Sequence, residues 1–173
     1  MILTREEILK EIEKGNIVIE PFDIKYLGPA SYDVALDNEI RIFKDEIYEI
    51  DIGEIAENTN IFNQVTEKIK LDDYYPLKPG ELVIGITKEK ITLSPGLCAW
   101  IQGRSRFARC GLMVHVSASF IQPGVSNKQV FEIYNASRNI IKLRPGVRIA
   151  QIIFQRCVGK AKYKGIFKNQ LKL

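Results

Sequence analysis

Short β-rich runs separated by turn residues constrain the fold of this chain more than any other feature of its sequence. Four of the turns carry a Pro-Gly pair, at 79–80, 95–96, 123–124 and 145–146, in which each residue type favours a reversal of the chain. The runs that we expect to form strands are Ile17–Ile19, Tyr32–Leu36, Ile40–Phe43, Ile47–Ile52, Leu82–Ile86, Leu97–Ile101, Met113–Val116, Val130–Tyr134 and Val147–Phe154. Regular short strands with such turns predict an all-β sandwich, jelly roll or distorted barrel.

One helix is expected before the first strand. Thr4-Arg5-Glu6-Glu7 has the pattern of a capping box, an apolar stripe of Ile8, Leu9 and Ile12 follows, and Gly15 supplies a stop signal. The predicted fold class is therefore mainly β, with one N-terminal helix and short helical turns.

Residues 1–173 are expected to form a single domain, because no linker, low-complexity tract or repeat divides them. The segment 58–73 is polar and weakly patterned, so we expect it to leave the core. The C-terminal segment 160–173 carries five lysines and no acid. Two interpretations of this segment stay open: a solvated basic tail, or a tail that folds over an anionic ligand.

Charge is distributed very unevenly along the chain. Residues 1–89 hold 20 of the 21 acids and 10 bases, whereas residues 90–173 hold 15 bases and a single acid, Glu132. This asymmetry suggests an anionic partner for the second half. No apolar run approaches the roughly 20 residues that a membrane helix needs, and the first residues lack the apolar core of a signal peptide. We therefore expect a soluble cytoplasmic protein with no membrane partner.

The single histidine, His115, and three widely spaced cysteines exclude several kinds of site. A zinc-dependent nucleotide deaminase needs a His or Cys followed by a Cys-x-x-Cys pair, and that pattern does not occur. The Gly-x-Ser-x-Gly elbow and the Walker and Rossmann glycine patterns are missing as well. We expect no protein zinc site, and we expect Cys98, Cys110 and Cys157 to be buried thiols. Enzyme chemistry would have to use carboxylate, hydroxyl and guanidinium groups.

The segment Gly103–Arg109 is the clearest candidate for an anion site. It follows a predicted strand and is expected to begin a helical turn, in which Ser105 and Arg109 share a face. The N–H groups of a first turn, a glycine that permits close approach, and arginines that fork phosphate oxygens together suit a phosphate group. The alternative is a surface helix with solvated arginines.

Glu132 is the only carboxylate that the second half offers for proton transfer. Strand alternation in Val130–Tyr134 places Glu132 on the face opposite Phe131 and Ile133. If that face is a pocket wall, Glu132 is a candidate general base. The alternative is a structural ion pair with Arg104, Arg106 or Arg109.

Several motifs, taken in order, resemble those of one family. They are Arg104-Ser105-x-x-Ala108-Arg109, Gly111-Leu112-Met113-Val114-His115-Val116-x-Ala118, Pro123-Gly124 and Phe131-Glu132-Ile133-Tyr134-Asn135, with support from Ser31-Tyr32-Asp33-Val34, Pro79-Gly80-Glu81, Arg144-Pro145-Gly146 and Ile149-Ala150-Gln151. Through these motifs, which span most of residues 1–163, the chain closely resembles the dCTP deaminases of the dUTPase-like superfamily.

The resemblance implies an activity and an assembly. It implies zinc-independent deamination of dCTP to dUTP and ammonia, a dUTPase-like fold, and a homotrimer with active sites between subunits. It also implies Mg²⁺ bound through the nucleotide triphosphate. A nucleoside triphosphate, rather than a nucleic acid, is then the expected partner of the basic half.

The matching positions imply residue roles. Glu132 matches the general base, while Ser105 and Arg109 match residues that order the attacking water and the base around it. Arg104 and Ser105 also match phosphate contacts. The other matched positions are Val116 and Ala118 for the cytosine edge, His115 near the site or in packing, Gln122 beside the sugar, Gln151 near the nucleotide, and Lys162 with Tyr163 in a segment that closes over the phosphates.

The chain departs from the family pattern at three positions. Gln122 stands in place of the aspartate of an Ile-Asp-Pro-Gly turn, Val125 in place of an aromatic residue in the same turn, and Ile166 in place of a glutamine of the tail. Two alternatives stay open beside the deaminase. One is hydrolysis of dUTP to dUMP and pyrophosphate, alone or after deamination, and the other is a nucleotide-binding protein with altered catalysis.

Overall fold

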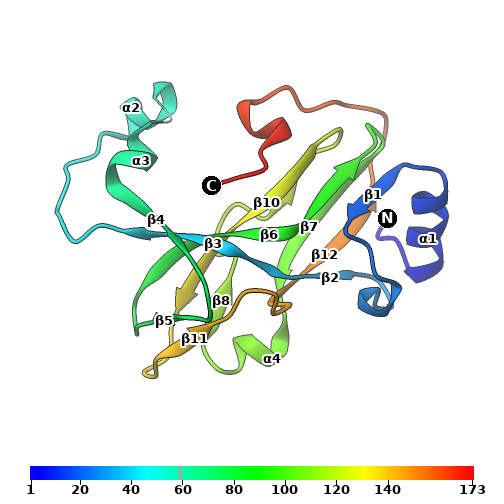
Figure 1. The fold of residues 1–173 in the computed structure, drawn as a ribbon. Coiled ribbons are helices and arrows are strands. Elements are labelled where there is room, and N and C mark those ends of the chain that lie inside the picture. Colours follow the sequence, from blue (N-terminus) through cyan, green and yellow to red (C-terminus); the bar gives the residue numbers. More distant parts are fainter. Residues whose placement is uncertain (59) are drawn as a thin grey trace.

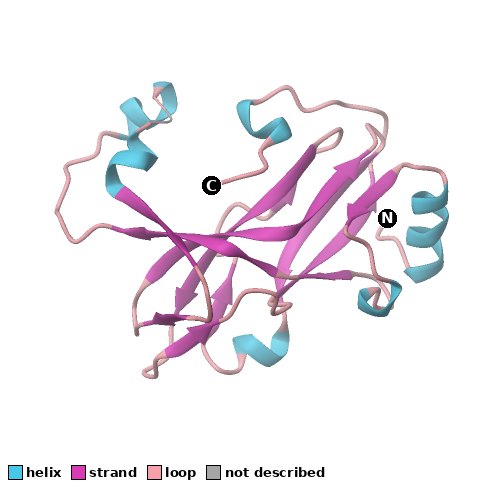
Figure 2. Ribbon diagram, in the orientation of Figure 1, coloured by secondary structure: helices cyan, strands magenta, loops and turns pink. Residues whose placement is uncertain are grey.

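Strands dominate the computed structural model of this chain, which describes residues 1–58 and 60–173 (Figures 1 and 2). In chain order the elements are α1 (Arg5–Glu13), β1 (Ile17–Glu20), the 3₁₀ turn η1 (Ile24–Tyr26), β2 (Tyr32–Val34), β3 (Leu36–Phe43), α2 (Ile52–Glu57), α3 (Ile61–Val65), β4 (Thr66–Lys70), β5 (Tyr75–Leu77), β6 (Leu82–Leu93), β7 (Leu97–Gly103), α4 (Ser105–Ala108), β8 (Leu112–Val114), β9 (Phe120–Ile121), β10 (Ser126–Asn135), β11 (Ile141–Leu143), β12 (Ala150–Arg156) and the 3₁₀ turn η2 (Ile166–Asn169). The predicted mainly-β class with an N-terminal helix is confirmed.

The strands form three sheets. The largest has the order β4-β3-β6-β10-β8, with β1 paired to β6; the second has the order β2-β12-β7-β9, and β11 pairs with β5. All of these pairings are antiparallel. Within the described residues the sheets do not close on themselves, because β4 and β8 end the largest sheet as edges. The distorted-barrel part of the prediction is corrected accordingly, to open packed sheets.

The core follows from strand alternation. In β10 every second residue is buried, and Phe131 and Ile133 are fully enclosed while Glu132 between them is half-buried. Tyr32 of β2 and Phe154 of β12 contribute large side chains from the second sheet to the same core. Burial of each such side chain stabilises the fold by about 1.5–3 kcal/mol, which holds this face of β10 against the core. The opposite face of β10 is therefore the one that is free to form a site.

Helix α1 packs as expected, although its N-terminus differs from the prediction. Ile8 is buried, and Gly15 follows the helix at φ +70°, with its N–H donating to Ile12 O. The Thr4 side chain makes no capping hydrogen bond, so the capping box does not form. Instead, Arg156 at the end of β12 binds Glu7 at 2.9 Å and Glu11 at 3.0 Å, which ties the helix to the second sheet.

Two segments between β3 and β5 were predicted wrongly. Ile47–Ile52 is no strand: the Asp51 side chain accepts a hydrogen bond from Gly53 N–H at 2.7 Å and caps α2 at that point. The segment 58–73, of which residue 59 lies outside the described part, contains α3 and β4. β4 pairs with β3 and is polar because it is an edge strand.

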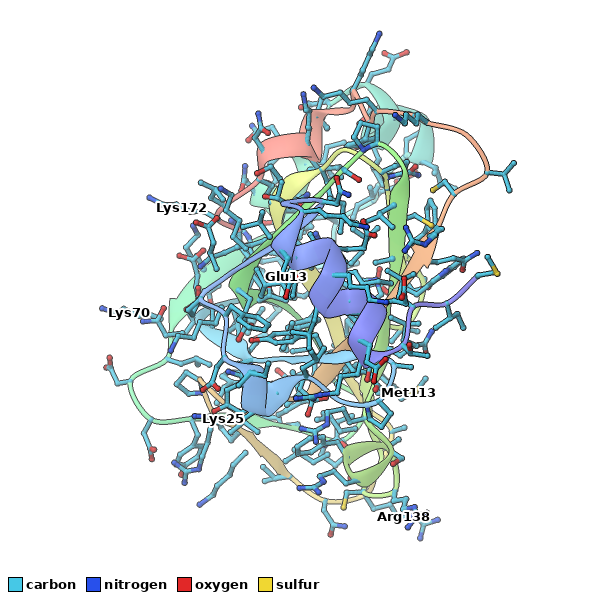
Figure 3. The ribbon with its side chains drawn as sticks, turned by 90° about the vertical axis from the view of Figure 1, so that its right-hand side faces the viewer. Glu13, Lys25, Lys70, Met113, Arg138 and Lys172 are labelled. Atoms are coloured by element: carbon cyan, nitrogen blue, oxygen red, sulfur yellow. The ribbon has the colours of Figure 1, made fainter. Side chains whose placement is uncertain are left out.

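The remaining expectations concern thiols and charges. Only Cys98 is buried, whereas Cys110, in the turn after α4, is exposed and Cys157 is partly exposed. Figure 3 shows Lys70, Arg138 and Lys172 extending away from the ribbon, as solvated charges do. None of the helices that the structure describes is long and apolar enough to cross a membrane.

Candidate active site

Glu132 of β10 lies where two cavities meet. Both the larger cavity, of about 890 Å³, and the smaller, of about 550 Å³, are lined by its side chain. β10 runs between β6 and β8, with Ile84 as the register partner of Glu132. The polar face of this central strand is therefore the wall that carries the carboxylate.

The Glu132 carboxylate is held by one serine. Ser117 donates its backbone N–H to Oε2 at 2.6 Å, and its hydroxyl lies 2.9 Å from each carboxylate oxygen. No salt bridge among the described residues includes Glu132, so the arginine ion pair considered from the sequence is absent from this part of the chain. The donors are neutral, which leaves the negative charge of the carboxylate uncompensated by a cation.

His115 places Ser117 over the carboxylate. His115 follows β8, has φ +67°, and donates its backbone N–H to Glu132 O at 2.8 Å. A non-glycine residue in this left-handed region costs of order 1–3 kcal/mol and is often found at functional sites. Both imidazole nitrogens are buried and lack a hydrogen-bond partner among the described residues, and the ring lines the larger cavity.

Four further predicted residues line these cavities, and Lys162 lies outside both. Ala118, Gln122 and Tyr163 line the larger one together with Glu132, and Val116 lines the smaller one. Lys162 is exposed and packs against Gly124, where a Cβ atom would lie 2.7 Å from Lys162 Cγ. Gly124 also has φ +76°. A residue with a side chain at position 124 would therefore be strained and would collide with the tail at Lys162.

The C-terminal tail docks along β10 and closes one side of the larger cavity. Tyr163 N–H donates to Pro123 O at 2.8 Å, Lys128 N–H to Gln170 O at 2.9 Å, and Asn127 Nδ2 to Phe167 O at 2.7 Å. The tail thus lies against the candidate site.

Sequence reasoning missed part of this site. Ser117 occupies the variable position of its motif, so the pattern gave no reason to single it out. The opposite wall of the larger cavity comes from the segment between β3 and β4, with apolar side chains that include Ile55, Ile61 and Phe62. That segment carried no motif, and an apolar lining has no distinctive sequence signal.

A second group of predicted residues lies apart from the first. Arg104, Ser105 and Arg109 surround α4, and neither cavity is lined by them. Figure 1 shows α4 at the bottom of the molecule and the C-terminal tail at the top. A single chain therefore does not bring the predicted phosphate contacts to the predicted base.

Contacts within the chain already involve Arg104 and another predicted residue, Gln151. Arg104 binds Asp33 at 2.9 Å and Arg148 O at 2.8 Å, and Gln151 Oε1 accepts from the Ser31 hydroxyl at 2.8 Å. Burial raises the pKa of Asp33, against the opposing charge of Arg104. The exposed Ser105 and Arg109 remain directed to the surface.

The described residues contain no group of three or more His, Cys, Asp or Glu side chains that could hold a metal ion. The Glu132 carboxylate borders two open cavities, a position from which a carboxylate can exchange a proton with a bound molecule.

Comparisons with known proteins agree on one family. A family model described as dCTP deaminase-like matches residues 2–157. A "dCTP deaminase, dUMP-forming" of Nocardioides sp. is 35% identical over 177 residues, covering 98% of this chain and 91% of the relative. A "dCTP deaminase" of Marinomonas sp. is 38% identical over 172 residues, covering 93% and 86%.

One solved structure shows the fold. The crystal structure of 2'-deoxycytidine 5'-triphosphate deaminase from Agrobacterium tumefaciens matches with a TM-score of 0.68 at 20% identity. The match covers 88% of this chain and 47% of that one. It confirms the fold that the sequence resemblance implied, with the sheets left open as described above.

Proposed function

Because the chain belongs to the dCTP deaminase-like family, we propose that it deaminates dCTP to dUTP and ammonia with Glu132 as the general base. The observation that carries the proposal is the Glu132 carboxylate, fixed by Ser117 at 2.6 and 2.9 Å on the wall of two cavities. A carboxylate held in one position by these hydrogen bonds can accept a proton from a water molecule beside it.

The proposed reaction needs one proton acceptor that also returns the proton. Glu132 takes a proton from water as the water oxygen bonds to cytosine C4. It then delivers that proton to the amino nitrogen, and the C4–N bond breaks to release ammonia. The chain segment 116–118 lines the same cavities and would receive the cytosine edge, with the small side chain of Ala118 leaving space beside the amino group.

A homotrimer would complete the site. Within one chain, Glu132 lines both cavities, and Arg104, Ser105, Arg109 and Gln151 line neither, so we assign their contacts with the triphosphate and the attacking water to a neighbouring copy. Closed rings with repeated interfaces make such shared sites geometrically possible. Arginine in that position also offsets the negative charge of the phosphates.

Magnesium would enter with the substrate. The described residues offer no carboxylate cluster to hold it, and Mg²⁺ is commonly bound through substrate phosphates. We propose Mg²⁺·dCTP as the bound species, and a cytoplasmic location where nucleoside triphosphates are made and consumed.

A second activity has its own support. The relative from Nocardioides is named as forming dUMP, which requires loss of pyrophosphate after deamination. Gln122, at the turn that borders the larger cavity, carries an amide and no carboxylate to activate a second water. We therefore place diphosphatase activity second.

One assay separates the two activities from simple binding. The protein is incubated with Mg²⁺ and either dCTP or dUTP, and ammonia, pyrophosphate and the nucleotide products are measured. Ammonia and dUTP from dCTP support the deaminase. Pyrophosphate and dUMP support the combined activity, and the absence of both product pairs would reject an enzymatic function.

A further inference from the structure

Cys98 and Cys157 lie on neighbouring strands where the C-terminal tail begins. Cys98 of β7 has Gln155 of β12 as its register partner, and Cys157 comes two residues after Gln155. Cys157 N–H donates to Gly96 O at 2.9 Å, which continues the strand pairing by one step. Residues two apart on a strand share a face, so the two cysteines form a diagonal pair on one side of the sheet.

The two thiols differ in exposure. Cys98 is 6% exposed and its Sγ–H donates to Gln155 O at 3.7 Å, whereas Cys157 is partly exposed. Burial, together with a hydrogen bond to Cys157, raises the pKa of Cys98 to about 11. Thiolates are the attacking species in disulfide exchange, so a reagent from solution meets Cys157 first.

We propose that Cys98 and Cys157 are a modification site that forms a reversible disulfide with an oxidised low-molecular-weight thiol such as glutathione disulfide. The Cys157 thiolate attacks one glutathione sulfur and releases the first glutathione thiolate. Cys98 then loses its proton, and its sulfur attacks the Cys157 sulfur and releases the second. Two protein thiols are oxidised, and one glutathione disulfide is reduced to two glutathiones.

The Cys98–Cys157 disulfide would attach the start of the C-terminal tail to the neighbouring strand. Ala161 N–H donates to Pro95 O at 3.0 Å, close to the bond between Cys157 and Gly96. These two hydrogen bonds attach the start of the tail to the turn that precedes Cys98. A covalent link at the same place would hold that attachment in addition to the two hydrogen bonds.

The test uses Cys110, which is exposed, as the internal comparison. The Cys110→Ser variant removes the route to an intermolecular disulfide. It is treated with glutathione disulfide under native conditions, and its mass and tryptic peptides are measured before and after reduction. We expect the loss of two hydrogen atoms, one linked peptide containing Cys98 and Cys157, and full reversal by reductant.

The matched control is the double variant Cys110→Ser, Cys157→Ser, in which no linked peptide should form and Cys98 should stay a free thiol. Amide exchange at Cys157 and Ala161 should slow several-fold in the oxidised form of Cys110→Ser. The proposal is overturned if Cys98 and Cys157 stay free, or if Cys157 stops at the glutathione adduct, under conditions in which Cys110 of the unchanged protein reacts. Unchanged exchange in the linked form would overturn the anchoring of the tail.

Discussion

The proposed base is held by neutral donors, and this determines what its replacement should do. In Glu132→Gln the side-chain oxygen can still accept from Ser117, while the capacity to accept a proton is lost. We expect ammonia release from dCTP to fall by about 10²–10⁴-fold, with nucleotide binding retained. Calorimetric titration with Mg²⁺·dCTP measures the binding. Ammonia release at the original rate would remove Glu132 from the mechanism.

Ser117 should act as a positioning residue. Ser117→Ala removes the hydroxyl and keeps the backbone N–H at 2.6 Å from Glu132 Oε2. A hydrogen bond to a charged group contributes about 1.5–3 kcal/mol, so kcat should fall by roughly 10-fold or more, while KM for dCTP changes little. Ser117→Thr retains a hydroxyl and should restore most of kcat. Equal losses in both variants would point to packing instead.

The sequence singles out the proposed base, Glu132, but not Ser117, which binds its carboxylate. Glu132 could be found because it is the single acid among 15 bases in residues 90–173. Ser117 binds Glu132 two residues after His115. His115 has a positive φ, which no local sequence pattern predicts. The family resemblance implied active sites between subunits, but motif order along a chain carries no information about which subunit supplies each residue.

At the scale of elements, the strands were predictable where one face is buried. β1 and β10 alternate between buried and more exposed residues, and Pro-Gly turns at 79–80 and 123–124 carry glycines with positive φ. β4 was missed because an edge strand exposes most of its residues. Ile47–Ile52 has the apolar content of a strand, but the cap at Asp51 starts a helix there.

The tail is the element whose removal tests closure of the cavity. Deleting residues 162–173 removes the Tyr163 contact to Pro123 and the Phe167 and Gln170 contacts to β10. The fold should persist, because nearly all of these residues are exposed or half-exposed, and KM for dCTP should rise about 10-fold through loss of a substrate-covering wall. Asn127→Ala, which removes only the bond to Phe167 O, should shift KM less in the same direction. A normal KM after deletion would contradict a role in binding.

An ion pair joins β6 of the largest sheet to Arg148, in the segment that precedes β12 of the second sheet. Glu89 of β6 is 0% exposed, binds Arg148 at 2.6 Å and accepts Ala35 N–H at 2.9 Å. Removing one partner of a buried pair typically costs about 3–5 kcal/mol, so Glu89→Leu should lower the melting temperature by about 10 °C. The exposed Lys25–Asp23 pair supplies the control, and Lys25→Ala should leave the melting temperature nearly unchanged. Equal shifts for both variants would contradict the assignment.

At the scale of the whole molecule, the question is whether the arginines and Glu132 of the basic half meet within one chain or between two copies. The arginines of α4 line neither of the cavities that Glu132 lines, so the proposed shared site needs two copies. Sedimentation velocity should therefore give a particle of about three chains. A monomer with full deaminase activity would reject the shared site.

Complementation tests the shared site directly. Glu132→Gln and Arg109→Ala should each be inactive as homotrimers, because the first lacks the base and the second lacks an arginine. If each site takes Glu132 from one subunit and Arg109 from its neighbour, mixed trimers contain sites in which both residues are intact. Each mixed trimer has one such site, so about one third of the sites in the isolated mixed trimers should be active. Co-expression with two affinity tags isolates the mixed trimers, and ammonia release measures the restored sites. A site built within one subunit predicts no recovery at all, since every chain in the mixture then carries one inactivating change.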